Sequence, residues 1–224
     1  MKTSKMKFYE SPHVTADTVI FTMAEDELKI LLVKRENLPF KDSWALPGVF
    51  LLKNESAERA AKRALREKTN VKVSYLEQLY TFDSPLRDPR GHVISIAYFA
   101  LISREKLSIK NSGVRAMFFS INKLPQLAFD HKTMVQYAVS RLRTKLEYTN
   151  VVYSLLPKHF TLGELQALYE IILKRRLDKR NFRKKFLSLK LVKQTRKYLQ
   201  SGRQRPAALY EFISRKPQEL KKFF

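Results

Sequence analysis

Apolar and polar residues alternate over several short segments between residues 13 and 120, as they do in β-strands. Each segment is rich in β-branched or aromatic residues and is bounded by charged residues, Gly or Pro. The segments with this pattern are Val14–Met23, Lys29–Lys34, Val71–Leu76, Gln78–Asp83, Val93–Leu101 and Ala116–Phe119. We predict a strand in each, with a turn at Trp44–Gly48.

Two segments in the same region have the periodicity of an amphipathic helix. After the possible N-cap Ser56, alanines and a leucine recur at i, i+3, i+4, i+7 and i+8 among charged residues. A second apolar stripe predicts a helix from about His131 to Leu146, with Asp130 placed to cap its start. Strands covered by these helices predict an α+β sandwich.

Helical periodicity returns after a boundary near residues 147–157. Thr161 and Glu164 have the spacing of a capping box, and Asp178 is placed to cap a second helix, Lys179–Leu189. Strand-like runs follow on either side of the Gly/Pro turn at 201–206; they are Leu191–Leu199 and Ala208–Ile213. This order of elements is typical of a winged helix-turn-helix.

Length and composition exclude several classes of protein. The 224 residues are 44% hydrophobic, which is enough for two packed domains and unlike a disordered chain. The basic start leads into a polar stretch, and no apolar run approaches the roughly 18 residues of a membrane span, so we expect neither signal peptide nor membrane association. With no Cys, the chain has no disulfide framework, which fits a cytoplasmic protein.

The charge indicates a polyanionic partner. The formal net charge is +23, and residues 147–224 contribute 19 basic against 6 acidic side chains. If Phe182 and Phe186 face inward, the helical period turns the basic and amide side chains of the same helix outward. These candidates for DNA contact are Lys179, Arg180, Asn181, Arg183, Lys184 and Lys185, with Arg203 and Arg205 on the turn.

Each residue type suits a different part of the double helix. Arg180 and Asn181 are suited to base edges in the major groove, whereas Lys179 and Lys185 are better placed for phosphates. Arginines on the turn suit phosphates or the minor groove. Duplex DNA is favoured over RNA because no strand carries an aromatic stacking platform, although a structured-RNA-binding protein stays an alternative.

The segment from Trp44 to Val71 resembles the signature loop, helix and loop of Nudix hydrolases. The family pattern is Gly, five residues, Glu, seven residues, Arg-Glu, an apolar residue, any residue, Glu-Glu, any residue, Gly and an apolar residue. Matching positions are Glu55, Arg63, Leu65, Glu67 and Val71. Departures are Val49 for the first Gly, Ala64 and Lys68 for two glutamates, and Asn70 for the last Gly.

These departures argue against the chemistry of the family, in which helix carboxylates hold Mg²⁺. Positions 64, 67 and 68 share one helix face, and there the chain offers one negative Glu67 and one positive Lys68. We therefore expect no catalytic residue, no metal ligand and no cofactor, and we expect Glu67 to pair with a neighbouring cation: Lys68, Arg63 or Arg66.

The whole chain, over about residues 12–214, resembles the Nudix-related transcriptional regulators. The segments that carry the resemblance are Leu76–Asp83, Arg87–Gly91, Val93–Tyr98, Leu127–His131, Phe160–Tyr169, Leu177–Lys185 and Gly202–Pro206. The resemblance implies a Nudix-like α/β/α sandwich with a C-terminal winged helix-turn-helix. The expected parts are a tail (1–12), a degenerate Nudix-like effector-sensing domain (13–147), a linker (148–157) and a DNA-binding domain (158–224).

The same resemblance implies a homodimeric repressor that binds palindromic operator DNA, senses ADP-ribose and controls NAD metabolism. Two alternatives stay open: a sugar-responsive regulator of the arabinose type, and a Nudix-type hydrolase of ADP-ribose. Candidates for holding an anionic, ribose-containing effector are Arg35, Lys68, Phe82, Asp83, Arg87 and Arg90. His131 has no neighbouring nucleophile in the sequence and is not assigned to catalysis.

Overall fold

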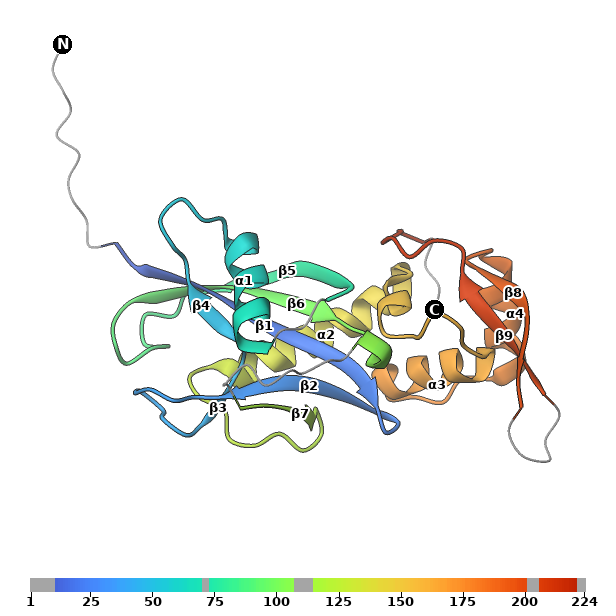
Figure 1. Ribbon diagram of the computed structural model, residues 1–224, viewed down its shortest axis with the longest axis horizontal. Coiled ribbons are helices and arrows are strands. Elements are labelled where there is room, and N and C mark those ends of the chain that lie inside the picture. The colour runs from blue at the N-terminus through green and yellow to red at the C-terminus, as the bar shows by residue number, and fades with distance from the viewer. Residues whose placement is uncertain (1–10, 70–72, 107–114, 201–205, 221–224) are drawn as a thin grey trace, which may run out of the picture.

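The computed structural model describes residues 11–69, 73–106, 115–200 and 206–220 (Figure 1). The strands of the N-terminal domain are β1 (His13–Ala24), β2 (Glu27–Lys34), β3 (Trp44–Ala45), β4 (Gly48–Phe50), β5 (Tyr75–Phe82), β6 (Val93–Leu101) and β7 (Ala116–Ser120). Its helices are α1 (Ala57–Thr69), α2 (His131–Tyr148) and the short 3₁₀ turn η1 (Arg104–Lys106). The remaining elements are η2 (Val151–Ser154), α3 (Leu162–Leu173), α4 (Lys179–Ser188), β8 (Val192–Leu199) and β9 (Ala207–Phe212).

Strand β1 is the centre of a mixed sheet with the order β3-β2-β1-β6-β5, in which β4 also pairs with β1 and β7 with β2. It runs antiparallel to β2 and parallel to β6. Successive residues of β1 serve opposite faces: Val19 and Phe21 pack in one cluster with α2, whereas Ile20 packs with Leu65 of α1. Helices on both faces of the sheet confirm the predicted α/β/α sandwich.

Two of the predicted strands form one. The structure has a single β5 where the sequence predicts Val71–Leu76 and Gln78–Asp83, of which residues 71 and 72 lie outside the described ranges. The polar Glu77 does not interrupt the strand, because its carboxylate pairs with Lys145 of α2 at 2.8 Å. The Trp44–Gly48 segment is not only a turn, since Trp44 and Ala45 pair with β2.

Local capping signals correspond to helix starts, with one exception. Thr161 and Glu164 form the predicted capping box, Asp178 accepts a hydrogen bond from the Asn181 N–H, and Ser56 Oγ accepts one from Arg59. The prediction for Asp130 is wrong: its side chain makes no capping bond. The carboxylate of Asp130 instead accepts hydrogen bonds from the guanidinium of Arg87, which lies on a distant loop.

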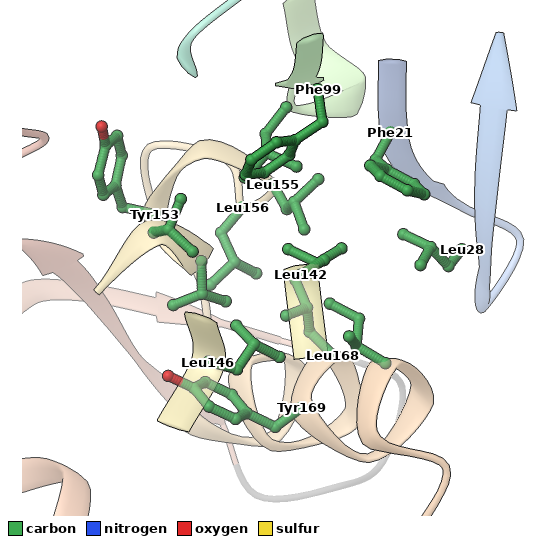
Figure 2. Packing of buried hydrophobic residues seen from close by; sticks show 14 of the residues in the cluster. Phe21, Leu28, Phe99, Leu142, Leu146, Tyr153, Leu155, Leu156, Leu168 and Tyr169 are labelled. Atoms are coloured by element: carbon green, nitrogen blue, oxygen red, sulfur yellow. The ribbon is translucent and has the colours of Figure 1, made fainter. Parts of the chain in front are cut away.

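One apolar cluster runs through both domains. Residues 148–157 were expected to form a linker, yet α2 extends to Tyr148 and the following turn is buried. Tyr153 and Leu155 are only 2% exposed. Leu155 lies between Phe99 of the N-terminal sheet and α3 (Figure 2), and Tyr153 packs against Phe212 of β9. The C-terminal elements form the expected winged helix-turn-helix, so the winged domain rests directly on the core of the first.

Candidate functional site

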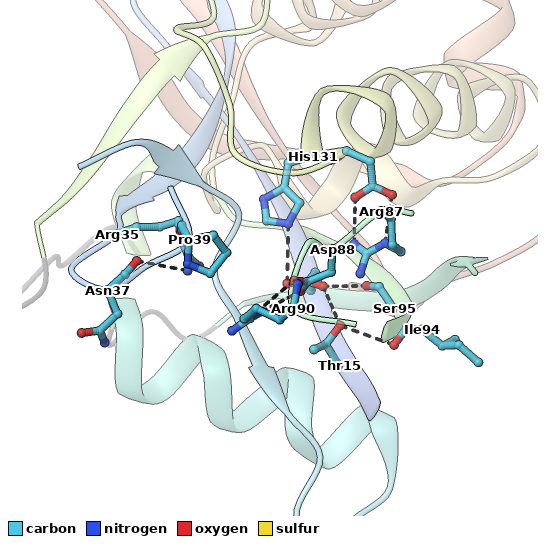
Figure 3. Close-up of polar contacts among 12 residues, drawn as sticks. Thr15, Arg35, Asn37, Pro39, Arg87, Asp88, Arg90, Ile94, Ser95 and His131 are labelled. Carbon is cyan, nitrogen blue, oxygen red and sulfur yellow. Dashed lines mark hydrogen bonds and ion pairs between the residues drawn. The ribbon is translucent and has the colours of Figure 1, made fainter. Parts of the chain in front are cut away.

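A cavity of about 100 Å³ lies where β1, β4 and the start of α2 meet (Figure 3). It is lined by Thr15, Asp17, Arg35, Leu46, Gly48, Val49, Phe50, Arg87, Asp88, Arg90, Phe129 and His131. Three of the six predicted effector residues, all arginines, are among them. We refer to this cavity as the effector pocket.

Asp17 forms the polar centre of the effector pocket. The carboxylate is buried and accepts hydrogen bonds from Thr15 Oγ1 at 3.0 Å and Ser95 Oγ at 2.6 Å. A Cβ atom at Gly48 would lie 1.8 Å from Asp17 Oδ1, so only glycine allows β4 to pass this close. The buried carboxylate and the glycine therefore determine the path of the chain beside the pocket.

His131 connects Asp17 to the loop before β4. Its Nδ1 accepts a hydrogen bond from the Leu46 N–H at 2.9 Å, and its Nε2 lies 4.0 Å from Asp17 Oδ1. Burial lowers the pKa of His131, against the opposing effect of Asp17. The imidazole is therefore neutral near pH 7, with its proton on Nε2 facing the carboxylate.

Arg87 is held by an ion pair within the pocket wall. Its Nε and Nη2 donate to the two carboxylate oxygens of Asp130 at 2.9 and 2.8 Å, and its side chain is 3% exposed. This bidentate pair joins the β5–β6 loop to the first residue before α2. Arg87 thus lines the pocket chiefly as a structural anchor.

Arg35 and Arg90 present their guanidinium groups to the ring of Phe129, with centroid distances of 4.7 and 5.6 Å. Arg90 also donates to Asp88 at 2.7 Å and lies over the Phe50 ring. Burial lowers the pKa of Arg35, and the positive charge of Arg90 lowers it further by a smaller amount. A second cavity of about 370 Å³ shares Phe50 and Arg90 with the effector pocket, so these two residues line both spaces.

The other predicted effector residues lie elsewhere. Lys68 lines a neighbouring cavity of about 120 Å³ that shares Arg35 and Gly48 with the effector pocket. Phe82 packs against Tyr80 and Tyr137, and neither Phe82 nor Asp83 lines any of these cavities. Sequence reasoning missed Asp17, Asp88 and Phe129. A charged residue inside the apolar run of β1 was the available signal for Asp17.

The signature helix is tied to its preceding loop by an ion-pair cluster. Arg63 donates from Nε and Nη2 to the two oxygens of Glu55 at 2.9 and 2.8 Å, which lowers the pKa of Glu55 to about 2. Glu67 lies 3.4 Å from Arg63 and 4.0 Å from Arg66, as expected. Among the described residues, no group of three or more His, Cys, Asp or Glu side chains is placed to hold a metal ion.

Helix α4 has the predicted orientation. Phe182 and Phe186 are buried against Tyr169, with ring centroids 5.4 and 6.1 Å apart. The exposed predicted residues are Lys179, Arg180, Asn181, Lys184 and Lys185. Arg183 is half-buried, whereas Arg203 and Arg205 lie outside the described residues. On the adjacent wing, Arg196 and Lys197 of β8 are exposed, and the sequence prediction did not include them because it placed the DNA contacts on the helix and the turn.

Within the described ranges, each helix is too short or too polar to cross a membrane. A family model described as "NUDIX domain" matches residues 12–138, and one described as "NrtR DNA-binding winged helix domain" matches residues 152–212. These two matches agree with the two halves of the fold.

Two relatives match this chain across both halves of the fold. The chain is 40% identical over 210 residues to the ADPR responsive transcriptional repressor NtrR of Acinetobacter baylyi, covering 91% of this chain and 83% of the relative. It also resembles the crystal structure of Shewanella oneidensis NrtR with a 27mer DNA, with a TM-score of 0.80, 36% identity, and 89% and 93% of the two chains covered.

Two further similarities concern the first domain alone. The NUDIX domain of Shewanella oneidensis NrtR, solved with ADP ribose, matches with a TM-score of 0.54 and 37% identity over 60% of this chain and 90% of that one. An ADP-ribose pyrophosphatase of Methanocaldococcus jannaschii is 40% identical over 132 residues, covering 59% of this chain and 76% of the relative. From its two matched domains and its full-length relatives, the chain belongs to the NrtR family of Nudix-related transcriptional regulators.

Proposed function

We propose that this chain is a transcriptional repressor that binds operator DNA through its winged helix and is released when ADP-ribose enters the effector pocket. One observation carries the proposal: an arginine-lined Nudix pocket and a basic α4 belong to one continuously packed chain. The ADPR-responsive relative and the ADP-ribose-bound NUDIX domain support the choice of effector. Control of NAD metabolism genes and a homodimer on a palindromic site are part of the same proposal.

The diphosphate of ADP-ribose is best matched by Arg35 and Arg90, because a guanidinium binds phosphate oxygens bidentately. The effector pocket of about 100 Å³ is too small for this ligand, whereas the neighbouring space of about 370 Å³ lies just beyond Arg90. We infer that the phosphates compete with Asp88 for Arg90 and join the two spaces. Ligand binding would then move the loop that carries Arg87.

That loop is connected to the winged helix through α2. Arg87 binds Asp130 at the start of α2, and Arg143 near its other end donates from Nε to the Ile172 carbonyl of α3 at 2.8 Å. A ligand shifts a conformational equilibrium only if it binds the two states differently. Displacement of Arg90 supplies such a difference, and α2 is the rigid element that transmits it.

The proposal is tested by fluorescence anisotropy with DNA from upstream of the chain's own gene and excess random competitor. Specific binding that ADP-ribose releases is the expected result. Arg90→Gln should leave operator affinity unchanged and raise the ADP-ribose concentration for half-release about tenfold, whereas the exposed Arg59→Gln should change neither. Release by arabinose alone would favour the sugar-responsive alternative, and DNA binding insensitive to both ligands would contradict the proposal.

The similarity to an ADP-ribose pyrophosphatase favours hydrolysis as a second candidate. Against it, the family's helix glutamates are replaced by a fully buried Ala64 and by Lys68, and Glu67 is paired with Arg63. These replacements remove carboxylates from the helix face on which a Nudix hydrolase holds Mg²⁺. Incubation of ADP-ribose with the protein and Mg²⁺ should yield no AMP. Formation of several molecules of AMP per molecule of protein would establish a hydrolase instead.

A further inference from the structure

Two turns of opposite charge, one from each domain, lie beside α3. The acidic turn joins β1 to β2 and carries Glu25 and Asp26, whereas the cationic turn joins α3 to α4 and carries Lys174, Arg175 and Arg176. Asp26 and these three cations line one cavity of about 400 Å³, at the place where the β1–β2 turn approaches α3 (Figure 1). A carboxylate of the first domain is therefore held close to cations of the second.

The acidic turn has a defined geometry. Ala24 pairs with Glu27, and the two residues between them adopt φ angles of 54° and 55°, as in a two-residue hairpin turn. Glu25 is compensated within its own domain, because its carboxylate pairs with Lys29 at 2.5 Å. Asp26 is exposed and has no ion pair or hydrogen bond with the residues that the structure describes. Asp26 is thus the carboxylate of this turn that faces the cations.

The cationic turn is held from its inner side. Glu170 accepts hydrogen bonds from the Leu177 N–H at 2.8 Å and from Gln166 Nε2 at 3.1 Å, and Gln166 also donates to the Leu177 carbonyl at 2.9 Å. Lys174 is the C-cap of α3, with a φ angle of 54°. Arg176 lies 3.5 Å from Glu170, yet its side chain is 96% exposed. The turn therefore presents its cations to the surroundings on a fixed backbone.

The cationic turn also lies at the end of α4 that is expected to approach DNA. The helix begins at Lys179, three positions after Arg176. In helix-turn-helix proteins the first part of the recognition helix enters the major groove. Residues just before it are then close to phosphates at the edge of the groove, and Lys and Arg side chains in such positions bind phosphate oxygens.

We propose that the acidic turn restrains DNA binding, because Asp26 competes with operator phosphates for the cations of the cationic turn. This inference rests on the proposed function, in which α4 binds the operator. In the free protein, Asp26 attracts Lys174, Arg175 and Arg176 across the cavity that they share. On DNA, the phosphates attract the same cations and repel Asp26. The first domain thus acts directly on the DNA-binding end of the second.

Fluorescence anisotropy with operator and random-sequence duplexes tests the restraint. Asp26→Asn keeps a residue that tolerates the left-handed backbone and should tighten binding to both duplexes about threefold, the size of an exposed ion pair. The gain should shrink as the salt concentration rises. Glu27→Gln removes the same charge one position away, outside the shared cavity, and should have a smaller effect. Equal gains from the two substitutions would show an effect of net charge alone and would overturn the proposal.

Removal of the cations supplies the second arm. Lys174→Asn, which also tolerates a left-handed conformation, should weaken binding to both duplexes and lower the salt dependence by about one phosphate contact. In a chain that carries Lys174→Asn and Arg175→Gln, the gain from Asp26→Asn should largely disappear. A full threefold gain in that background, or no gain from Asp26→Asn in the otherwise unaltered chain, would overturn the restraint. Preference for the operator over random DNA tests the proposed function separately, and it should persist in Asp26→Asn.

Discussion

Buried polar residues beside the effector pocket determine its shape through a few short contacts. Asp17 is satisfied by two hydroxyls, His131 fixes the Leu46 N–H, and Arg87 neutralises Asp130. An unpaired charge in this setting would cost several kcal/mol, so each group depends on its partner. The pocket is therefore sensitive to the protonation of its one histidine.

Acidification should destabilise the protein through His131. Burial lowers its pKa from the ordinary value near 6.5, so below that pH the unfolded chain binds a proton that the folded chain refuses. The free energy of unfolding should therefore decrease as the pH is lowered below about 6.5. This group contributes at most about 1.4 kcal/mol per pH unit to the decrease. In urea denaturation between pH 7.5 and 5, the free energy of unfolding of His131→Gln should decrease less than that of the unaltered protein. An equal decrease in the two proteins would refute this.

Helices and their ends follow from local chemistry, which is why the sequence predicts them well. The alanine stripe of α1 and the Thr161 capping box depend on residues within a few positions. Contacts between distant residues are different: Arg87 lies 43 positions from Asp130, and that pairing replaces the expected helix cap. The surroundings of Phe82 also depend on distant residues, since only the fold places Tyr137 of α2 beside it.

Helix α2 should carry the effector signal, and Arg143 is its contact with α3. Arg143→Ala removes the hydrogen bond to the Ile172 carbonyl while leaving both binding surfaces intact. The ADP-ribose concentration for half-release should then rise about fivefold, at the low end of usual coupling energies, with operator affinity in the absence of ligand little changed. The exposed Gln136→Ala on the same helix serves as the control. An unchanged release curve for Arg143→Ala would exclude this route.

Helix α4 should separate base reading from phosphate binding. Arg180 lies opposite the buried Phe182 and Phe186 face, so Arg180→Ala should cost about 1–3 kcal/mol on the operator and relax selectivity at one base pair. Lys179→Ala, at the exposed start of the helix, should weaken operator and random DNA alike and reduce the salt dependence. Anisotropy on both DNAs measures this, and an equal loss for both variants would show that Arg180 reads no base.

At the scale of the whole molecule, the two domains share one core although each corresponds to a separate family match. The uniting cluster extends from Val19 and Phe21 of β1 through Tyr153 to Phe186 and Phe212 of the winged helix. Arg215 reinforces the junction by donating to the carbonyls of Tyr153, Leu156 and Pro157. A shared core explains how a pocket in one domain is able to influence a surface on the other.

The same continuity predicts that the chain unfolds as one unit. Independent domains would melt separately, but here neither half is able to expose its part of the cluster without removing apolar contacts from the other. Scanning calorimetry of the full chain should give one transition with equal calorimetric and van't Hoff enthalpies. Leu156→Asp buries a charge at the junction and should lower the midpoint of that single transition. Two resolved transitions in the unaltered protein would mean that the domains are coupled only through α2, and the transmission of the ADP-ribose signal would then depend on Arg143 and its neighbours alone.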